Sequence, residues 1–118
     1  MSIDDNKIVE APYIKFFIAK FMSSPDVAIN METHEVGAYI LLLFTSFLEK
    51  KKGYLKNDDE YLRKITRLKK SVWKKSRDII LKKFKTDVDG YLYNEKFLYE
   101  IMEAEKSIKT NLNRTQTA

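Results

Sequence analysis

The Lys and Arg side chains between Leu62 and Lys85 are the residues with the clearest chemical potential in this sequence. This segment holds eleven of the 22 basic residues of the chain and a single acid, Asp78, which leaves 11 basic and 16 acidic residues elsewhere. It therefore has a net charge of +10, against −5 for the remainder. Such cations bind anions, phosphate above all. Charge this concentrated has no evident structural role, and it indicates a binding surface.

The basic residues of this segment also follow helical spacing. At about 100° per residue, Trp73, Ile80 and Phe84 fall on one side of a helix, whereas Lys74 and Lys75 fall on the other. A basic helix that rests on a core and faces outwards is typical of nucleic-acid-binding proteins. The alternative is a solvated Lys-rich face that binds nothing, and the self-repulsion of so much charge argues against it.

The candidate DNA-binding residues divide by their place along this helix. Those expected near base edges, outward in its N-terminal half, are Ser71, Lys74, Lys75 and Asp78. Those expected at phosphates are Arg63, Lys64, Lys69, Lys82, Lys83 and Lys85, and Lys70 at the helix start completes the set. Few of them are Arg, Asn or Gln, the usual base readers, so the sequence does not predict strong sequence specificity.

The flanking residues predict a helix-turn-helix followed by a hairpin. A short helix begins at Asn57, with Glu60 in a capping-box-like position, and a turn over 66–70 leads into the basic helix, expected from Lys70 to Phe84. The pair Asp89-Gly90 between β-prone segments predicts a β-hairpin. A hairpin directly after a recognition helix would form the wing of a winged helix-turn-helix domain.

The remaining elements would support this unit. A short strand is expected over 12–17 and a helical turn over 18–22. A central helix should begin at an Asn30 cap and run to about Lys52, where Gly53 offers a left-handed end. Because its middle, Ala38 to Phe44, is apolar nearly all round, it is either the centre of the core or the interface of a homodimer. A last helix from Asn94 should fade past Lys106.

The sequence offers little for metal, cofactor or catalytic chemistry. It has no cysteine, and its single histidine, His34, cannot close a zinc site and is expected to be an ordinary surface residue. The acids Asp58, Asp59 and Glu60 could suggest a divalent metal, but at a helix start they are better explained as caps. Trp73 could stack on a base, but its place on the apolar face favours core packing. We therefore expect no enzyme, no cofactor and no metal site.

Length and composition predict one domain. The 118 residues divide into a polar leader over 1–11, a domain over 12–106 and a polar tail over 107–118. The leader does not resemble a secretory signal, and the longest uninterrupted apolar run is seven residues. A cytoplasmic protein without a membrane partner is expected.

Five short motifs occur along the chain in a characteristic order. They are Pro12-Tyr13-Ile14-Lys15-Phe16, Glu35-Val36-Gly37-Ala38-Tyr39 with Leu41-Leu42-Leu43, Tyr54-Leu55-Lys56-Asn57-Asp58, Leu68 with Trp73, and Asp89-Gly90-Tyr91-Leu92-Tyr93-Asn94. Together they resemble a known family, the YdaU-like domain of unknown function at the N-terminus of phage and prophage replication-initiation proteins. The resemblance covers roughly residues 12–104. It implies a winged-helix DNA-binding module of phage-type replication initiation, in a bacterial cell or phage-infected host, near a replicative helicase or helicase loader.

The sequence thus predicts an α+β, mostly α, winged helix-turn-helix domain with a C-terminal β-hairpin wing and a final helix. The expected function is non-catalytic binding of duplex DNA, with the basic helix in or across the major groove and the wing on the adjacent backbone. The alternative is an adaptor of the same fold that holds an acidic protein, such as a host replication or transcription factor, through the same basic face.

Overall fold

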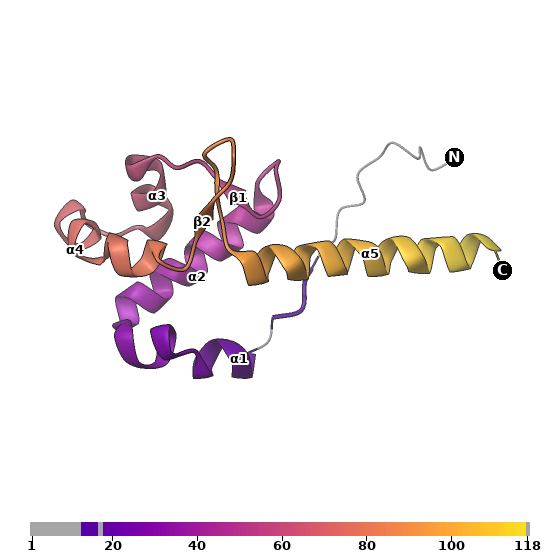
Figure 1. Ribbon diagram of the computed structural model, residues 1–118, viewed down its shortest axis with the longest axis horizontal. Coiled ribbons are helices and arrows are strands. Elements are labelled where there is room, and N and C mark those ends of the chain that lie inside the picture. Colours follow the sequence, from indigo (N-terminus) through magenta and orange to yellow (C-terminus); the bar gives the residue numbers. More distant parts are fainter. Residues whose placement is uncertain (1–12, 17, 118) are drawn as a thin grey trace.

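The computed structural model describes residues 13–16 and 18–117, in which helices predominate and three short strands form one antiparallel sheet (Figure 1). The elements in chain order are α1 (Ile18–Ser23), the π-helical turn η1 (Asp26–Asn30), α2 (Thr33–Leu48), β1 (Tyr54–Leu55), α3 (Asp59–Thr66), α4 (Lys70–Leu81), β2 (Lys85–Thr86), β3 (Leu92–Tyr93) and α5 (Glu95–Thr117). The expected class, α+β and mostly α, is confirmed. The predicted leader over 1–11 lies outside the described residues.

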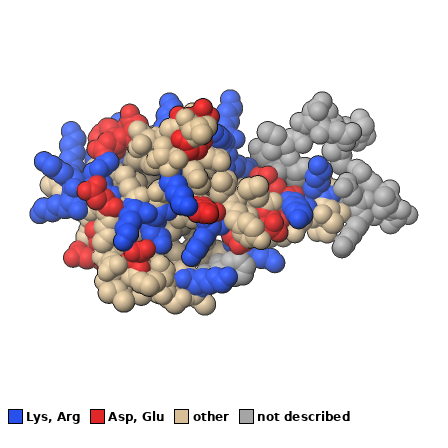
Figure 2. Space-filling view, in the orientation of Figure 1, with Lys and Arg blue, Asp and Glu red and all other residues tan. Residues whose placement is uncertain are grey.

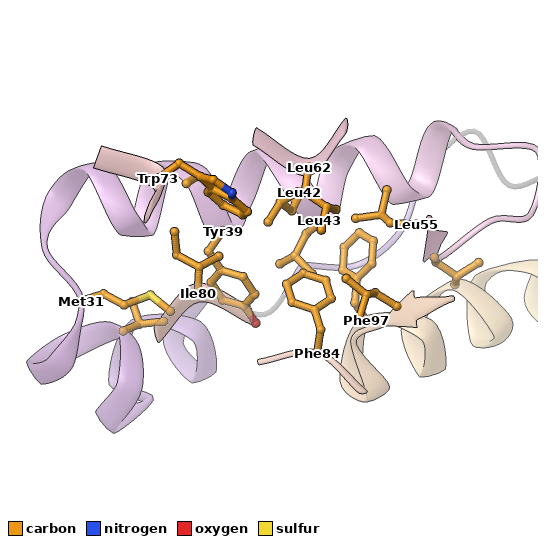
Figure 3. Packing of buried hydrophobic residues seen from close by; sticks show 14 residues of the cluster. Met31, Tyr39, Leu42, Leu43, Leu55, Leu62, Trp73, Ile80, Phe84 and Phe97 are labelled. Atoms are coloured by element: carbon orange, nitrogen blue, oxygen red, sulfur yellow. The ribbon is translucent and has the colours of Figure 1, made fainter. Parts of the chain in front are cut away.

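The core forms where α3 and α4 cross α2 (Figure 3). Leu42 of α2, Leu62 of α3 and Ile80 of α4 are each 0% exposed. Leu55, Phe84 and Phe97 extend this cluster towards the sheet and α5. One cluster therefore fixes the relative positions of α2, α3, α4 and α5, because each contributes buried apolar side chains.

The ends of α2 differ from the prediction. Its N-cap is Glu32 rather than Asn30: the Glu32 side chain accepts from the Glu35 amide, and the Glu35 side chain accepts from the Glu32 amide at 2.8 Å. The helix ends at Leu48 rather than near Lys52, because the Gly53 amide donates to the carbonyl of Ser46 at 2.8 Å and turns the chain back. Gly53 has a φ of 91°, and a Cβ there would lie 2.8 Å from the Leu98 side chain.

The sheet has the order β1-β3-β2 and includes a strand that the sequence did not predict. The predicted hairpin is present as β2 and β3, with Lys85 opposite Tyr93 and with Gly90 at a φ of 86°. The unpredicted strand is β1, which pairs with the other edge of β3. Conversely, residues 13–16 form no strand, and the ends of that predicted strand, Pro12 and Phe17, lie outside the described residues.

Helix α5 is longer than predicted. It continues through the residues expected to form a polar tail, as far as Thr117, and its second half projects away from the other elements (Figure 1). Basic helix α4, by contrast, is shorter than predicted: it ends at Leu81, and Phe84 lies in the connection to β2.

Asn94 joins four parts of the structure through one buried side chain. Its Nδ2 donates to the Tyr39 hydroxyl of α2 at 3.0 Å and to the Lys83 carbonyl after α4 at 2.9 Å. Its Oδ1 accepts from the Phe97 amide at 2.9 Å and thereby caps α5 directly after β3. Burial raises the pKa of Tyr39 to about 12, although the hydrogen bond from Asn94 acts in the opposite direction.

We expect Asn94→Ala to lower the free energy of unfolding by about 2–4 kcal/mol, because it removes a helix cap and leaves buried polar groups unpaired. Chemical denaturation measures this loss. Asn57→Ala is the control, since Asn57 is exposed on the surface. Equal stabilities of the two variants would show that the Asn94 bonds contribute little.

Candidate nucleic-acid interface

The turn between α3 and α4 is held by hydrogen bonds from side chains within it. The Thr66 hydroxyl donates to the Arg63 carbonyl at 2.7 Å, and the Arg63 guanidinium donates to the Leu68 carbonyl at 3.0 Å. Arg67 ends α3 in the left-handed conformation, with a φ of 63°, and its amide donates to the Arg63 carbonyl at 3.0 Å. Because a non-glycine residue rarely adopts this conformation, the turn is held in a specific shape at some cost in strain.

Helices α3 and α4 are joined by Asp59, Trp73 and Arg77. The indole Nε1 of Trp73 donates to Asp59 Oδ1 at 2.9 Å, and Arg77 Nε donates to the same oxygen at 2.8 Å. These two bonds, the indole bond first, hold the pKa of Asp59 below its ordinary value. Trp73 is only 2% exposed, so its predicted place in the core is confirmed and its ring cannot stack on a base.

The predicted faces of α4 are confirmed. Trp73, Ser76 and Ile80 are buried on the inner side, and the outward residues expected near bases, Ser71, Lys74, Lys75 and Asp78, are exposed. Asp78 accepts from Arg77 at 2.9 Å. The outward face therefore presents two lysines and a serine, together with one acid that its neighbour partly neutralises.

Four of the predicted phosphate-binding residues have acidic partners. Lys83 and Lys82 approach Asp26 of η1 at 3.2 and 3.6 Å, and the hydrogen bond from Lys83 holds the pKa of Asp26 below its ordinary value. The other two pairs are Arg63 with Glu60 and Lys85 with Glu95. Because these acids compensate the cations, we expect the four side chains to contribute less to DNA binding than the sequence suggested.

Six cations around the α3–α4 turn remain exposed and form no ion pair with any residue that the structure describes. They are Lys64, Arg67, Lys69, Lys70, Lys74 and Lys75, and we call them the turn surface. Figure 2 shows Lys and Arg side chains gathered at the end of the molecule where α4 lies. Arg67 was not among the predicted site residues, and its left-handed backbone could not be read from the sequence.

The N-terminus of α4 is electrostatically unusual. No described side chain caps it and its first turn has no acid, while its first backbone bond runs from the Trp73 amide to the Lys69 carbonyl at 2.9 Å. The amides of Lys70, Ser71 and Val72 precede that bond and point out of the helix end. Lysines there repel the positive end of the helix dipole, so a bound anion would relieve both the repulsion and the missing cap.

The tip of the β2–β3 hairpin is acidic. Its Asp87 side chain accepts from the amides of Asp89 and Tyr91 at 2.9 and 2.8 Å and pairs with Lys51 at 3.2 Å. Val88 and Asp89 are exposed at the tip. Lys51 compensates Asp87, so Asp89 is the exposed acid of the tip, and residues 87–91 include no cation. A tip of this kind disfavours the contact between wing and DNA backbone that the sequence-based hypothesis included.

The candidate metal ligands have structural roles. Asp58 accepts from the Tyr61 amide at 2.9 Å and is the N-cap of α3, which begins at Asp59. The predicted helix start at Asn57, with Glu60 in a capping box, is therefore wrong: Glu60 accepts instead from Arg63. Elsewhere, ligand atoms of Glu32, His34 and Glu35 lie within 4.8 Å of one another, but both glutamates form the capping box of α2. His34, predicted to be an ordinary surface residue, is exposed, yet its Nε2 lies 3.1 Å from Ser76 Oγ and links α2 to α4.

Comparison with known families places most of the chain in one of them. Residues 12–102 match the family described as "Protein of unknown function (DUF1376)". The chain belongs to this family. No curated protein and no solved structure matches the chain. The DUF1376 match confirms a domain of unknown function, whereas a part in phage replication stays a prediction. None of the described helices has the length and apolar character to cross a membrane.

We expect Trp73→Ala to lower the free energy of unfolding by about 3–5 kcal/mol, the usual loss for a buried aromatic ring. Trp73→Phe keeps most of the packing but removes the bond to Asp59, and should cost about 1 kcal/mol. Thermal and chemical unfolding test both values. Unchanged stability of Trp73→Ala would contradict the role of this ring in the core.

Proposed function

We propose that this DUF1376 protein binds duplex DNA without catalysis, through the turn surface and the outward face of α4. The observation that carries this proposal is the set of six exposed, unpaired cations around an uncapped helix N-terminus in the described part of the chain. Phosphate is the anion that such a surface fits, because it takes both the side-chain cations and the free amides.

The order of elements supports a winged helix-turn-helix mode of binding. Helix α3, a tight turn, α4 and the β2–β3 hairpin follow one another as in such domains, which would make α4 the recognition helix. Its inner face is fixed against α2 and α3, and its outer face is exposed. In this mode α4 would lie in or across the major groove.

The side chains suggest an interface dominated by the DNA backbone. Lys64, Arg67, Lys69 and Lys70 flank the start of α4 and would contact phosphates, whereas Ser71, Lys74 and Lys75 would face the base edges. Arg67 is the one arginine of the turn surface, and its planar guanidinium is the group best suited to a bidentate contact with a base or phosphate. We therefore propose weak sequence preference, with specificity for a site supplied by a partner.

The family resemblance suggests where this binding would be used. It points to phage-type replication initiation in the cytoplasm of a bacterial or phage-infected cell, next to a replicative helicase or helicase loader. Non-specific affinity for duplex DNA would suit such a role, because the partner would select the origin.

The acidic hairpin tip favours a second candidate, an adaptor that holds an acidic protein on the turn surface. Asp89 at the tip and Asp78 on α4 would repel a long phosphate backbone more than a short acidic peptide. Both partners would give salt-dependent binding, so salt alone does not separate them. Direct titration with duplex DNA separates the two candidates, because the adaptor does not require binding of DNA.

We expect the protein to bind a fluorescently labelled 20-base-pair duplex with log K falling against log salt at a slope of about −4 to −5, as for roughly five contacted phosphates. Lys74→Ala with Lys75→Ala should weaken binding and reduce the slope by about two if each lysine meets a phosphate, and by less if they meet bases. Fluorescence anisotropy at several salt concentrations measures both quantities.

Lys82→Ala with Lys83→Ala is the matched control on the same helix. Because Asp26 compensates both lysines, this variant should change the slope by less than one. Equal losses in the two double variants would contradict the turn surface as the main interface. Binding of acidic proteins with no duplex binding at low salt would favour the adaptor.

A further inference from the structure

Helix α2 has an apolar stripe on its outer side that the described residues leave open. The stripe consists of Gly37, Leu41, Phe44 and Leu48, and its spacing of four, three and four residues keeps it on one face. Phe44 is 49% exposed and Leu48 is 78% exposed. The buried residues of α2, among them Ala38 and Leu42, lie on the opposite side against α3 and α4.

The stripe is also free of charge. Between Val36 and Leu48 the sequence has no charged residue, although 33% of the whole chain is charged. An exposed helix face in a soluble domain is normally rich in charged side chains, so an apolar one of this length marks a contact surface. Phe16 packs against one member of the stripe, with its ring centroid 5.9 Å from that of Phe44, and still leaves 49% of Phe44 exposed.

We propose that α2 pairs with α2 of a second copy of the chain, in an antiparallel arrangement related by a two-fold axis. If the axis passes between Leu41 and Phe44, Leu48 of each copy lies opposite Gly37 of the other. A Cβ placed on Gly37 would meet no described atom within 4 Å, so the missing side chain leaves open space on the stripe, which we call the recess. Because a two-fold axis relates the copies, Leu48 of each copy fills the recess of the other. The same face therefore serves as the contact surface on both chains.

The charges beyond the ends of α2 favour this orientation. Glu32 precedes the helix, with its side chain 78% exposed, and Lys50 is exposed just after its C-terminal end. Antiparallel pairing brings the helix end that carries Glu32 beside the end of the other copy that carries Lys50, whereas parallel pairing would bring like charges together. The helix dipoles also oppose each other in this arrangement.

The turn surface lies over α3 and α4, on the other side of α2, and stays accessible in the dimer.

Weak association is expected, because one pair of helices about 24 Å long gives a small interface. Sedimentation equilibrium between 10 µM and 1 mM should give a dissociation constant on the order of 100 µM.

Leu48→Lys should raise this dissociation constant by at least about tenfold, since each interface would bury two added charges. Ile29→Lys is the matched control, because Ile29 of η1 is 79% exposed but lies off the stripe. The Ile29→Lys variant should change the dissociation constant of the dimer by less than about twofold.

Gly37→Gln tests the recess without threatening the fold. The position is helical and open, so the variant should be at least as stable as the parent chain while its association is lost. A parent chain that stays monomeric to 1 mM would overturn the proposal, as would equal effects of Leu48→Lys and Ile29→Lys.

Orientation can be tested because the chain contains no cysteine. Gly37→Cys and Leu48→Cys chains are prepared separately, mixed and joined with a short bis-maleimide, and the products are weighed by mass spectrometry. Antiparallel pairing predicts mostly mixed dimers that contain one chain of each variant. Products that join like with like would show parallel pairing and overturn the proposed arrangement.

Discussion

The buried side chain of Asn94 is the constraint on which the arrangement of the structure depends. Its three hydrogen bonds fix α2, the end of α4, the hairpin and the start of α5 relative to one another. A buried amide is stabilising only when its donors and acceptors are paired, so the four segments must meet in one geometry. Tyr39, one of its partners, also packs edge-on against Phe84, with the ring centroids 5.9 Å apart. Polar and aromatic contacts thus hold the C-terminal end of α4 in place.

Because these contacts fix the C-terminal end of α4, its N-terminal end is the part that exposes uncompensated charge. The bond between Trp73 and Asp59 secures its inner face to α3, while Asp26 and Glu95 neutralise the lysines near its C-terminal end. Uncompensated charge is concentrated in the turn surface as a result. The lysines at the uncapped start of α4 have an electrostatic cost for the free protein, which an anionic ligand would relieve. This local conflict with helix chemistry is the strongest physical reason to regard the region as a binding site.

The sequence predicted what depends on local pattern and missed what depends on distant partners. Helical periodicity placed Trp73 and Ile80 inside and Lys74 and Lys75 outside, and the Asp89-Gly90 pair predicted the hairpin. Strand β1 has only two residues and exists because β3 pairs with it, so no local signal marked it. The end of α2 depends on the bond from Gly53 back to Ser46. The contact between Lys83 and Asp26 joins residues 57 positions apart, and therefore the compensation of Lys82 and Lys83 could not be foreseen.

The most direct test of DNA binding by the turn surface is a titration of the isotopically labelled chain with duplex DNA, followed by NMR through its backbone amides. The free amides of Ser71 and Val72 and the charged residues around them form the proposed contact. Binding there should therefore give the largest chemical-shift changes within residues 67–75 and small changes at the acidic hairpin tip. Shifts concentrated at residues 87–91, with residues 67–75 unchanged, would contradict the turn surface as the site of DNA binding.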